Sequence, residues 1–196
     1  MFNPRKILVI RFSALGDLVL TSPIYRELKR VYPKAEITLL SSSGVIAVLR
    51  NNPHIDHYIS YNRMQTHKGL GVLIRKLRKE KYELIYDAHR SIRSIWITWN
   101  LSGFGIFNTP QVWFINKRSW RRILFIYFKI NLLKNTQSQR HHLLGPLQDM
   151  TEKEIQNHTE LFTDRDTVLT VKDFMKKKKT ETETFYSYRC FCFIST

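Results

Sequence analysis

The sequence has few of the residues that cross-link a chain or interrupt its elements. Its only two cysteines, Cys190 and Cys192, are one residue apart near the C-terminus and have no Cys or His partners at metal spacing. This excludes a disulfide framework and a zinc site. With 7 Gly, 6 Pro and 43% hydrophobic residues among 196, the composition is that of a globular chain rather than a disordered one. A chain of this length can hold one well-packed domain, or one domain plus a tail.

Long hydrophobic runs are also missing. The most apolar window, Ile123 to Leu133, is about half the length that a bilayer requires, and Lys129 interrupts it. The apolar run Ile7 to Ile10 is too short for the core of a signal peptide and stops at Arg11. We therefore expect a cytoplasmic protein without a membrane span.

Acidic residues are scarce, with 16 Asp and Glu against 32 Lys and Arg, and the formal net charge is +16. Residues 1–150 hold 24 of the basic and 8 of the acidic residues, so the whole excess lies there, and residues 151–196 are neutral. A domain this basic indicates an anionic partner: a nucleic acid, a phospholipid surface or a phosphorylated glycolipid. Charge alone does not choose among the three.

Short β-rich runs alternate with helical patterns over the first 130 residues. Strands are expected at residues 6–12, 36–40, 57–61, 84–87 and 112–115. Helices are expected from Pro23 to Pro33 with Ser22 as N-cap, and at residues 44–50, 70–80, 92–101 and 120–132. This β-α order predicts an α/β fold, a Rossmann-like parallel sheet with helices on both faces.

The periodicity ends near residue 135. We expect a Rossmann-like domain over residues 1–135, an irregular connecting segment over 136–175 and a tail over 176–196. The tail begins with four lysines, which an adenine tract prone to slippage could encode, so it is predicted to be out of frame or disordered. Residues after about 150 are expected to pack weakly, because they show little apolar periodicity.

Two loops carry the residues with chemistry, because ligands of open α/β sheets bind at the carboxyl ends of strands. The first loop runs from Ser13 to Asp17. Gly16 permits a tight turn close to a ligand, and Asp17 suits a general base that removes a proton from a hydroxyl. The alternative is that Asp17 only caps the next helix. The loop lacks the glycine-rich nucleotide fingerprints.

The second loop follows the fourth expected strand and contains Arg90 and Arg93, three residues apart at a helix start. With the helix-terminal amides, the two guanidinium groups could form a fork for phosphate or carboxylate oxygens. The alternative is an ordinary solvated surface. His89 is expected to be a packed loop residue rather than a catalyst.

The opening KILVIRFSALGDLVLTSPIYRELKRVYPKAEITLL resembles the start of glycosyltransferase family 9, the ADP-heptose:lipopolysaccharide heptosyltransferases. The family pattern is an apolar strand, then R-x-S-x-x-G-D, then T-x-P entering a helix. It is matched by Arg11, Ser13, Gly16, Asp17, Thr21 and Pro23. NPHIDHYISYNR and KYELIYDAHRSIRS resemble two further family segments, so the similarity covers roughly residues 6–130. Family members often carry Gly where this chain has Arg90.

The resemblance implies the acceptor-binding N-terminal domain of a GT-B fold, in which two Rossmann-like domains face each other. It implies inverting, metal-independent transfer without a cofactor, with Asp17 as the base. The implied substrate-binding residues are Ser13, Gly16, Arg90, Arg93 and Ser94. The acceptor would be lipopolysaccharide core or another anionic glycolipid, and the donor an ADP-heptose type of sugar nucleotide.

The donor-binding half of the family is absent from these 196 residues, so a chain inactive by itself is expected. The alternative is a non-enzymatic fragment that binds an anionic glycolipid or a membrane surface. Peripheral contact with the inner face of the cytoplasmic membrane agrees with both hypotheses. Nucleic-acid binding is not expected, because no recognised motif is present.

Overall fold

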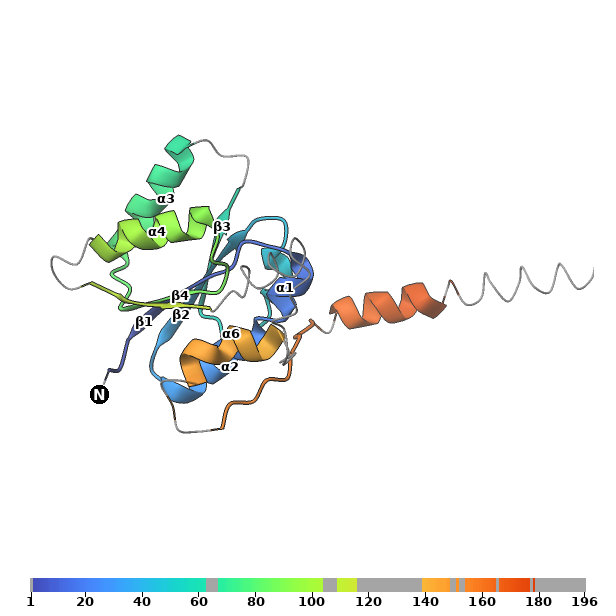
Figure 1. The fold of residues 1–196 in the computed structure, drawn as a ribbon. Helices are drawn as coiled ribbons and strands as arrows, with labels where there is room; N and C mark the ends of the chain where they lie inside the picture. The colour runs from blue at the N-terminus through green and yellow to red at the C-terminus, as the bar shows by residue number, and fades with distance from the viewer. Residues whose placement is uncertain are drawn as a thin grey trace, which may run out of the picture. The chain divides into compact units, whose positions relative to one another are not determined.

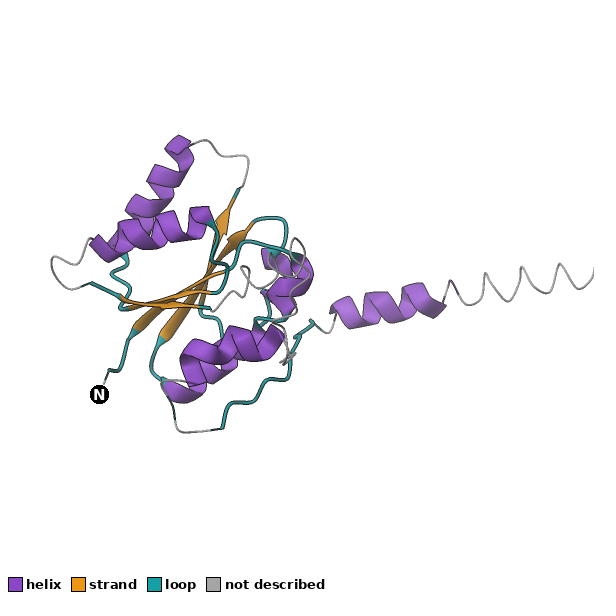
Figure 2. Ribbon diagram, viewed as in Figure 1, coloured by secondary structure: helices purple, strands orange, loops and turns teal. Residues whose placement is uncertain are grey.

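The computed structural model describes residues 2–62, 67–103, 109–115, 139–148, 151, 154–164, 166–176 and 178. The chain divides into two compact units, residues 1–161 and residues 162–196. The first unit contains the sheet and the helices that cover it (Figures 1 and 2).

The sheet has five parallel strands in the order β3-β2-β1-β4-β5. The strands are β1 (Lys6–Ile10), β2 (Glu36–Ser42), β3 (His57–Tyr61), β4 (Leu84–Asp87) and β5 (Gln111–Phe114). All five expected strands are confirmed, and β3 and β4 have the predicted bounds. β1 ends two residues earlier than expected, and β2 continues two residues further.

Helices cover both faces of this sheet, which confirms the predicted fold class (Figure 1). One face carries α1 (Leu15–Val19), α2 (Ser22–Val31) and α6 (Gln139–Gln148), and the other carries α3 (His67–Lys79) and α4 (Ile92–Ser102). A 3₁₀ turn, η1 (Ile46–Leu49), follows β2. The expected helix at 120–132 lies outside the described residues.

The alternation of side chains along the central strand β1 builds both halves of the core. Ile7 and Val9 join the cluster under α2 and α6, while Leu8 and Ile10 join the cluster under α3 and α4. All four side chains are fully buried. An unbroken apolar run is therefore what this strand requires, because it has no solvent-facing side.

The start of α2 differs from the prediction by one residue. Thr21, not Ser22, is the N-cap, and its hydroxyl donates to the carbonyl of Leu18 at 2.6 Å. Ser22 is the first helical residue, and its hydroxyl accepts a hydrogen bond from the amide of Glu160 at 2.8 Å. The Ser22 hydroxyl, which the sequence predicts to cap α2, therefore bonds the backbone amide of the distant Glu160 instead.

Residues 139–148 form a helix where the sequence predicts an irregular segment. Gly145 and Pro146 argue against a helix at this place in the sequence, because Pro removes a backbone donor from a helix interior. Leu143, Leu144 and Leu147 are nonetheless buried in the core beneath the sheet, and the Tyr86 hydroxyl donates to the carbonyl of Leu143. Tertiary burial thus outweighs poor helix propensity at α6.

Residues 154–160 lie along α2 and are held there by arginines. The Arg26 guanidinium donates to the carbonyl of Gln156 at 2.7 Å and pairs with the carboxylate of Glu160. Arg30 donates to the carbonyl of Glu154 at 2.6 Å. Polar contacts thus join this stretch to α2 although none of its residues is buried, and weak packing after residue 150 stays a prediction.

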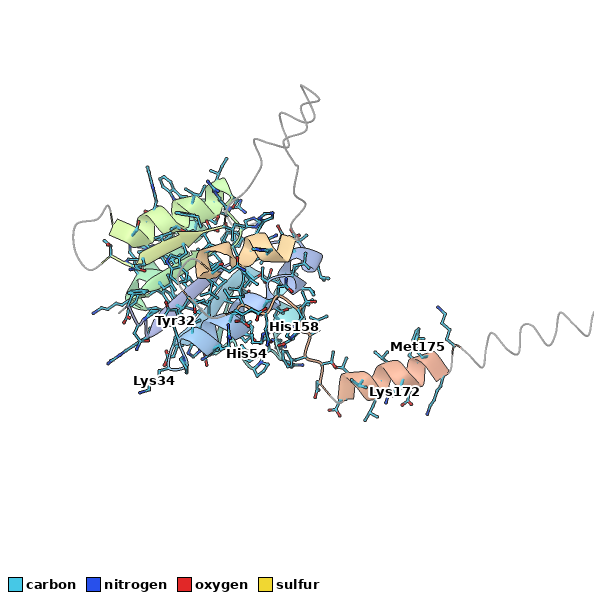
Figure 3. The ribbon with its side chains drawn as sticks, turned by 60° about the horizontal axis from the view of Figure 1, so that its bottom comes forward. Tyr32, Lys34, His54, His158, Lys172 and Met175 are labelled. Atoms are coloured by element: carbon cyan, nitrogen blue, oxygen red, sulfur yellow. The ribbon has the colours of Figure 1, made fainter. Side chains whose placement is uncertain are left out.

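Glu160 lies among several basic side chains. His158 lies 2.8 Å and His54 3.9 Å from its carboxylate, and Figure 3 labels both histidines. Burial by itself raises the pKa of Glu160, but the hydrogen bond and positive charge of Arg26 outweigh it and hold that pKa below its usual value. The carboxylate is thus an ionised anchor at neutral pH.

The second unit contains a helix over residues 166–176, on which Lys172 and Met175 are labelled in Figure 3. Its apolar side chains are exposed, among them Leu169 and Phe174. Most of the expected tail, including both cysteines, lies outside the described residues. Within the described part of the chain, no helix is long and apolar enough to cross a membrane.

Removing one leucine of α6 tests whether this helix belongs to the core. Leu147 is fully buried, whereas Leu161 is 55% exposed. We expect Leu147→Ala to lower the free energy of unfolding by about 2–5 kcal/mol, because it leaves a cavity. Leu161→Ala is the matched control and should change it by less than about 0.5 kcal/mol in denaturant titrations. Equal effects of the two variants would show that α6 is not part of the core.

Acidification should release residues 154–160 from α2. Since the pKa of Glu160 is below its usual 4.5 in the fold, its ion pair contributes fully above pH 4.5 and is lost as the pH falls through the lowered value. We expect the protection of the Glu160 amide against hydrogen exchange to drop in that range, while β2 stays protected. Glu160→Gln should have lost this protection already at neutral pH, and a slow amide in that variant would contradict the anchor.

Candidate active site

The strand order brings the two predicted loops together. β1 and β4 are neighbours, with Ile10 paired to Asp87 at their carboxyl ends. The loop after β1 leads to Asp17 in α1, and the loop after β4 leads to Arg93 in α4. Both residues therefore lie at the carboxyl edge of the sheet, as expected for a shared site.

Arg11 joins the two loops. Its side chain is only 6% exposed, and its backbone amide extends the sheet by donating to Leu40 at 2.9 Å. One guanidinium nitrogen, Nη2, lies 2.5 Å from Oδ2 of Asp17, and the other, Nη1, donates to the carbonyl of Ala88. A single buried cation thus positions the carboxylate of the first loop against the backbone of the second.

Asp17 makes a contact of the capping kind as well as an ion pair, and its role as a base stays a prediction. Its Oδ2 also accepts from the amide of Ala14, but at a long 3.5 Å, so the contact with the start of α1 is weak beside the ion pair. The side chain keeps 37% of its surface exposed. A solvent-accessible carboxylate oriented by a fixed cation can accept a proton from a bound hydroxyl.

Aromatic side chains connect the loop after β1 to the start of α4. The ring of Phe12 lies 5.5 Å from that of His89, edge to face, and 5.7 Å from that of Tyr61. The guanidinium of Arg93 lies 5.4 Å from the centre of the Tyr61 ring, at cation–π distance. His89 is thus a packed residue, as expected, and Arg93 is an exposed cation at the edge of the site.

The turn after β4 is built by Asp87, a residue that the sequence interpretation did not single out. Its buried Oδ1 accepts from the amides of His89 at 2.9 Å and Arg90 at 2.7 Å. Arg90 has φ 48°, in the left-handed region that favours glycine. This conformation gives a physical reason for the Gly that family members often carry here.

The two arginines contact different parts of the sheet edge. Arg90 Nη1 donates to the carbonyl of Ile115 after β5 at 3.0 Å, whereas Arg93 lies over Tyr61 at the end of β3. Arg90 also precedes the N-cap, Ser91, and is therefore not part of α4. The two guanidinium groups therefore contact different residues of the protein, and a fork for a phosphate or carboxylate of a ligand stays a prediction.

Ser94 is fully buried and engaged in the first turn of α4. Its hydroxyl accepts from the amide of Ser91 at 2.8 Å and donates to the carbonyl of Ser91 at 3.0 Å. The Ser91 hydroxyl in turn accepts from the amide of Ser94 at 3.2 Å, completing a reciprocal cap. Ser94 therefore acts on the site by fixing the helix start that carries Arg93.

Ser13 and Gly16 lie in the first loop, beside Asp17. Gly16 is exposed within α1, its φ is not in the left-handed region, and a Cβ there would meet no atom within 4 Å. The turn therefore does not require glycine, and the space beside it is open to a ligand. Ser13 is half-buried in the same loop, and substrate contact by either residue stays a prediction.

Within the described ranges, no group of three His, Cys, Asp or Glu side chains is placed to hold a metal ion. The edge instead offers one exposed carboxylate, one buried guanidinium and the exposed Arg93. These groups can accept a proton and bind an anionic substrate.

The left-handed turn at Arg90 makes a testable difference between two substitutions. Arg90→Gly and Arg90→Ala both lose the hydrogen bond to Ile115, but only glycine relieves the backbone, so the Gly variant should be more stable by about 1 kcal/mol. At Arg93, in α4, the order should reverse, with Ala the more stable by up to about 1 kcal/mol. Thermal or denaturant unfolding of the four variants measures both signs. If the Ala variant were the more stable at position 90 as well as at position 93, the turn after β4 would not be left-handed.

Comparison with known proteins points to one group of enzymes, although no protein-family model matches the chain. Lipopolysaccharide heptosyltransferase 3 of Escherichia coli is 33% identical over 77 residues, 37% of this chain and 23% of that protein. Lipopolysaccharide core heptosyltransferase OpsX of Haemophilus influenzae is 22% identical over 116 residues, 59% of this chain and 32% of that protein. The chain thus spans roughly a quarter to a third of these curated relatives.

The fold agrees with the sequence similarity. The crystal structure of the glycosyl transferase family 9 protein from Veillonella parvula superimposes with a TM-score of 0.70 at 16% identity, over 91% of this chain and 51% of that chain. At this identity the likeness concerns the fold alone. Together with the sequence matches, it shows that the chain is similar to heptosyltransferases over part of their length, and that its α/β fold matches about half of a glycosyltransferase family 9 structure.

Proposed function

We propose that this chain is the acceptor-binding half of a glycosyltransferase that moves a heptose or related sugar from a nucleotide sugar to lipopolysaccharide core. The observation that carries the proposal is the exposed carboxylate of Asp17, held at the carboxyl edge by the buried Arg11. The matched relatives named as lipopolysaccharide heptosyltransferases support the sugar and the acceptor class.

In the proposed reaction Asp17 removes the proton of an acceptor hydroxyl. The freed oxygen attacks the anomeric carbon of the donor sugar, and the carbon–oxygen bond to the nucleotide diphosphate breaks with inversion. The leaving diphosphate takes the electron pair and needs positive or hydrogen-bonding groups to stabilise it. Arg11 acts as a positioning residue, since it bonds one carboxylate oxygen of Asp17 and the backbone of the facing loop.

The acceptor is proposed to be an anionic glycolipid, which would match the excess of basic residues in the first 150 positions. Arg93 is the cation best placed to meet its phosphate or carboxylate groups, because it is exposed at the edge beside Tyr61. Arg90, Ser13 and Gly16 are proposed as further acceptor contacts around the same edge. We propose no metal ion or cofactor for this step, and no nucleic-acid partner.

The second candidate is a non-enzymatic fragment that binds an anionic glycolipid. The excess of basic residues in the first 150 positions supports it, because such a surface attracts an anionic glycolipid whether or not sugar is transferred. In either case we propose a location in the cytoplasm, on the inner face of the cytoplasmic membrane, where a lipid-linked acceptor would be met.

The polypeptide of residues 1–196 should show no sugar transfer by itself. Transfer requires donor and acceptor to be held in register, which can account for about 7–11 kcal/mol of the barrier. Joining residues 1–161 to the C-terminal half of the Veillonella parvula protein should restore turnover, measured as nucleoside diphosphate released in the presence of acceptor. Transfer by the 196-residue chain alone would contradict the two-half mechanism.

In that chimera, Asp17→Asn should lower kcat by about 10²–10⁴-fold with little change in acceptor binding, because an amide cannot take up the hydroxyl proton. The variant also loses the ion pair with Arg11, so its melting temperature is measured alongside to show that it is folded. The matched control is Glu36→Gln, which neutralises an exposed carboxylate at the start of β2, on the opposite edge of the sheet. The control should keep the parent rate. A chimera that keeps its rate without the Asp17 carboxylate would exclude this residue as the base.

A further inference from the structure

The outward side of α4 carries an apolar stripe whose side chains are exposed. Ile92, Ile95, Trp96 and Trp99 recur at the spacing that places them on one side of a helix, and they are 90%, 37%, 54% and 59% exposed. The inward side is filled by Ser94, Ile97 and Thr98, which are buried. The sheet therefore accounts for the buried side of α4 but not for its apolar outward side.

The neighbouring helix α3 surrounds this stripe with positive charge. Arg75, Lys76, Arg78 and Lys79 are exposed on α3, and neither α3 nor α4 contains an Asp or Glu. The two helices pack side by side on one face of the sheet (Figure 1). A groove of about 470 Å³ between them is lined by Arg75, Arg78 and Trp96, so basic and aromatic side chains meet in it.

Arg78 shows how the charge is kept at this surface. Its Nε and Nη2 donate to the carbonyl of Asn100 at 3.0 and 2.7 Å, in the last turn of α4. A guanidinium at a helix C-terminus is favoured by the helix dipole. The Arg78 guanidinium thus lies between α3 and α4, in the groove that Trp96 also lines.

We propose that this surface, the outer side of α3 and α4, docks on a bilayer that contains anionic phospholipids. Tryptophan prefers the boundary between headgroups and acyl chains, and isoleucine gains from burial below it. Basic residues beside the apolar stripe are attracted to the lipid phosphates, as in helices that lie in the membrane plane. The surface combines all three features within two adjacent helices.

Other occupants fit these side chains less well. A protein partner would need acidic side chains placed opposite these particular cations, whereas the headgroups of an anionic bilayer offer negative charge across a continuous surface. A nucleic acid would neutralise the cations but would leave the two isoleucines without an apolar environment. The uniform charge and the aliphatic stripe together favour a lipid surface.

Docking in this way would place the proposed active site next to the membrane. Ile92 and Arg93 are consecutive residues at the start of α4, so the stripe begins at the carboxyl edge where Asp17 lies. A hydroxyl of a lipid-linked acceptor would be presented beside that edge. Only this last step rests on the proposed transferase function, and the docking itself does not.

Vesicle flotation of the full chain tests the surface without any measurement of sugar transfer. We expect binding to vesicles of phosphatidylcholine mixed with phosphatidylglycerol, little binding to phosphatidylcholine alone, and weaker binding as salt is raised. Trp96→Ser with Trp99→Ser, and separately Arg75→Gln with Lys76→Gln, should each lower the partition constant at least about ten-fold. Brominated acyl chains should quench the tryptophan fluorescence of the parent chain and quench that of the tryptophan variant far less.

Matched controls change the same residue classes elsewhere. Lys34→Gln with Lys172→Gln removes two exposed cations, and Phe174→Ser removes an exposed aromatic ring that is 61% exposed, so each should bind as the parent does. Equal binding to neutral vesicles, or an equal loss in the controls, would overturn the proposal. Parent-like binding by the tryptophan variant would also overturn it, since unspecific electrostatic adsorption would then suffice. If the tryptophan variant shows no cooperative melting transition and is therefore unfolded, the binding of the Arg75→Gln, Lys76→Gln variant alone tests the proposal.

Discussion

The pairing of β1 with strands on both of its sides is the constraint on which the rest of this structure depends. β1 lies at the centre of the order β3-β2-β1-β4-β5, and its side chains enter the core on both faces. The parallel register with β4 brings the residues after Ile10 beside those after Asp87. The candidate site exists because these two carboxyl ends are neighbours, and any slip of the register would separate Arg11 from Ala88.

Arg11 holds the loops after β1 and β4 in a fixed arrangement. A buried guanidinium needs charged or polar partners, and it finds them in the carboxylate of Asp17 and the carbonyl of Ala88. The same contacts fix the direction of Asp17 and tie α1 to the turn after β4. Stability and the proposed chemistry therefore rest on the side chain of Arg11, which contacts the half-buried carboxylate of Asp17 and the buried carbonyl of Ala88.

The two sides of α4 show how one short helix can serve different environments. Ser94, Ile97 and Thr98 face the sheet, while Ile92, Trp96 and Trp99 are exposed. The first set explains why the helix forms and where it begins, through the reciprocal cap of Ser91 and Ser94. The second set is exposed, and its combination with the cations of α3 is what a lipid surface would use.

The sequence by itself determined the five strands, the parallel α/β architecture and the placement of Asp17 and Arg93 at the carboxyl edge of the sheet, because side-chain periodicity and chain order are local properties. The tertiary structure made β1 and β4 neighbours. The sequence did not predict α6, where Gly145 and Pro146 oppose a helix that Leu143 and Leu147 stabilise only by burial. It also did not predict the contact of Arg26 with Glu160, which joins residues 134 positions apart. Only the tertiary structure decided that Arg90 is in a left-handed turn and that Arg11 orients Asp17, since each depends on partners that are distant in the chain.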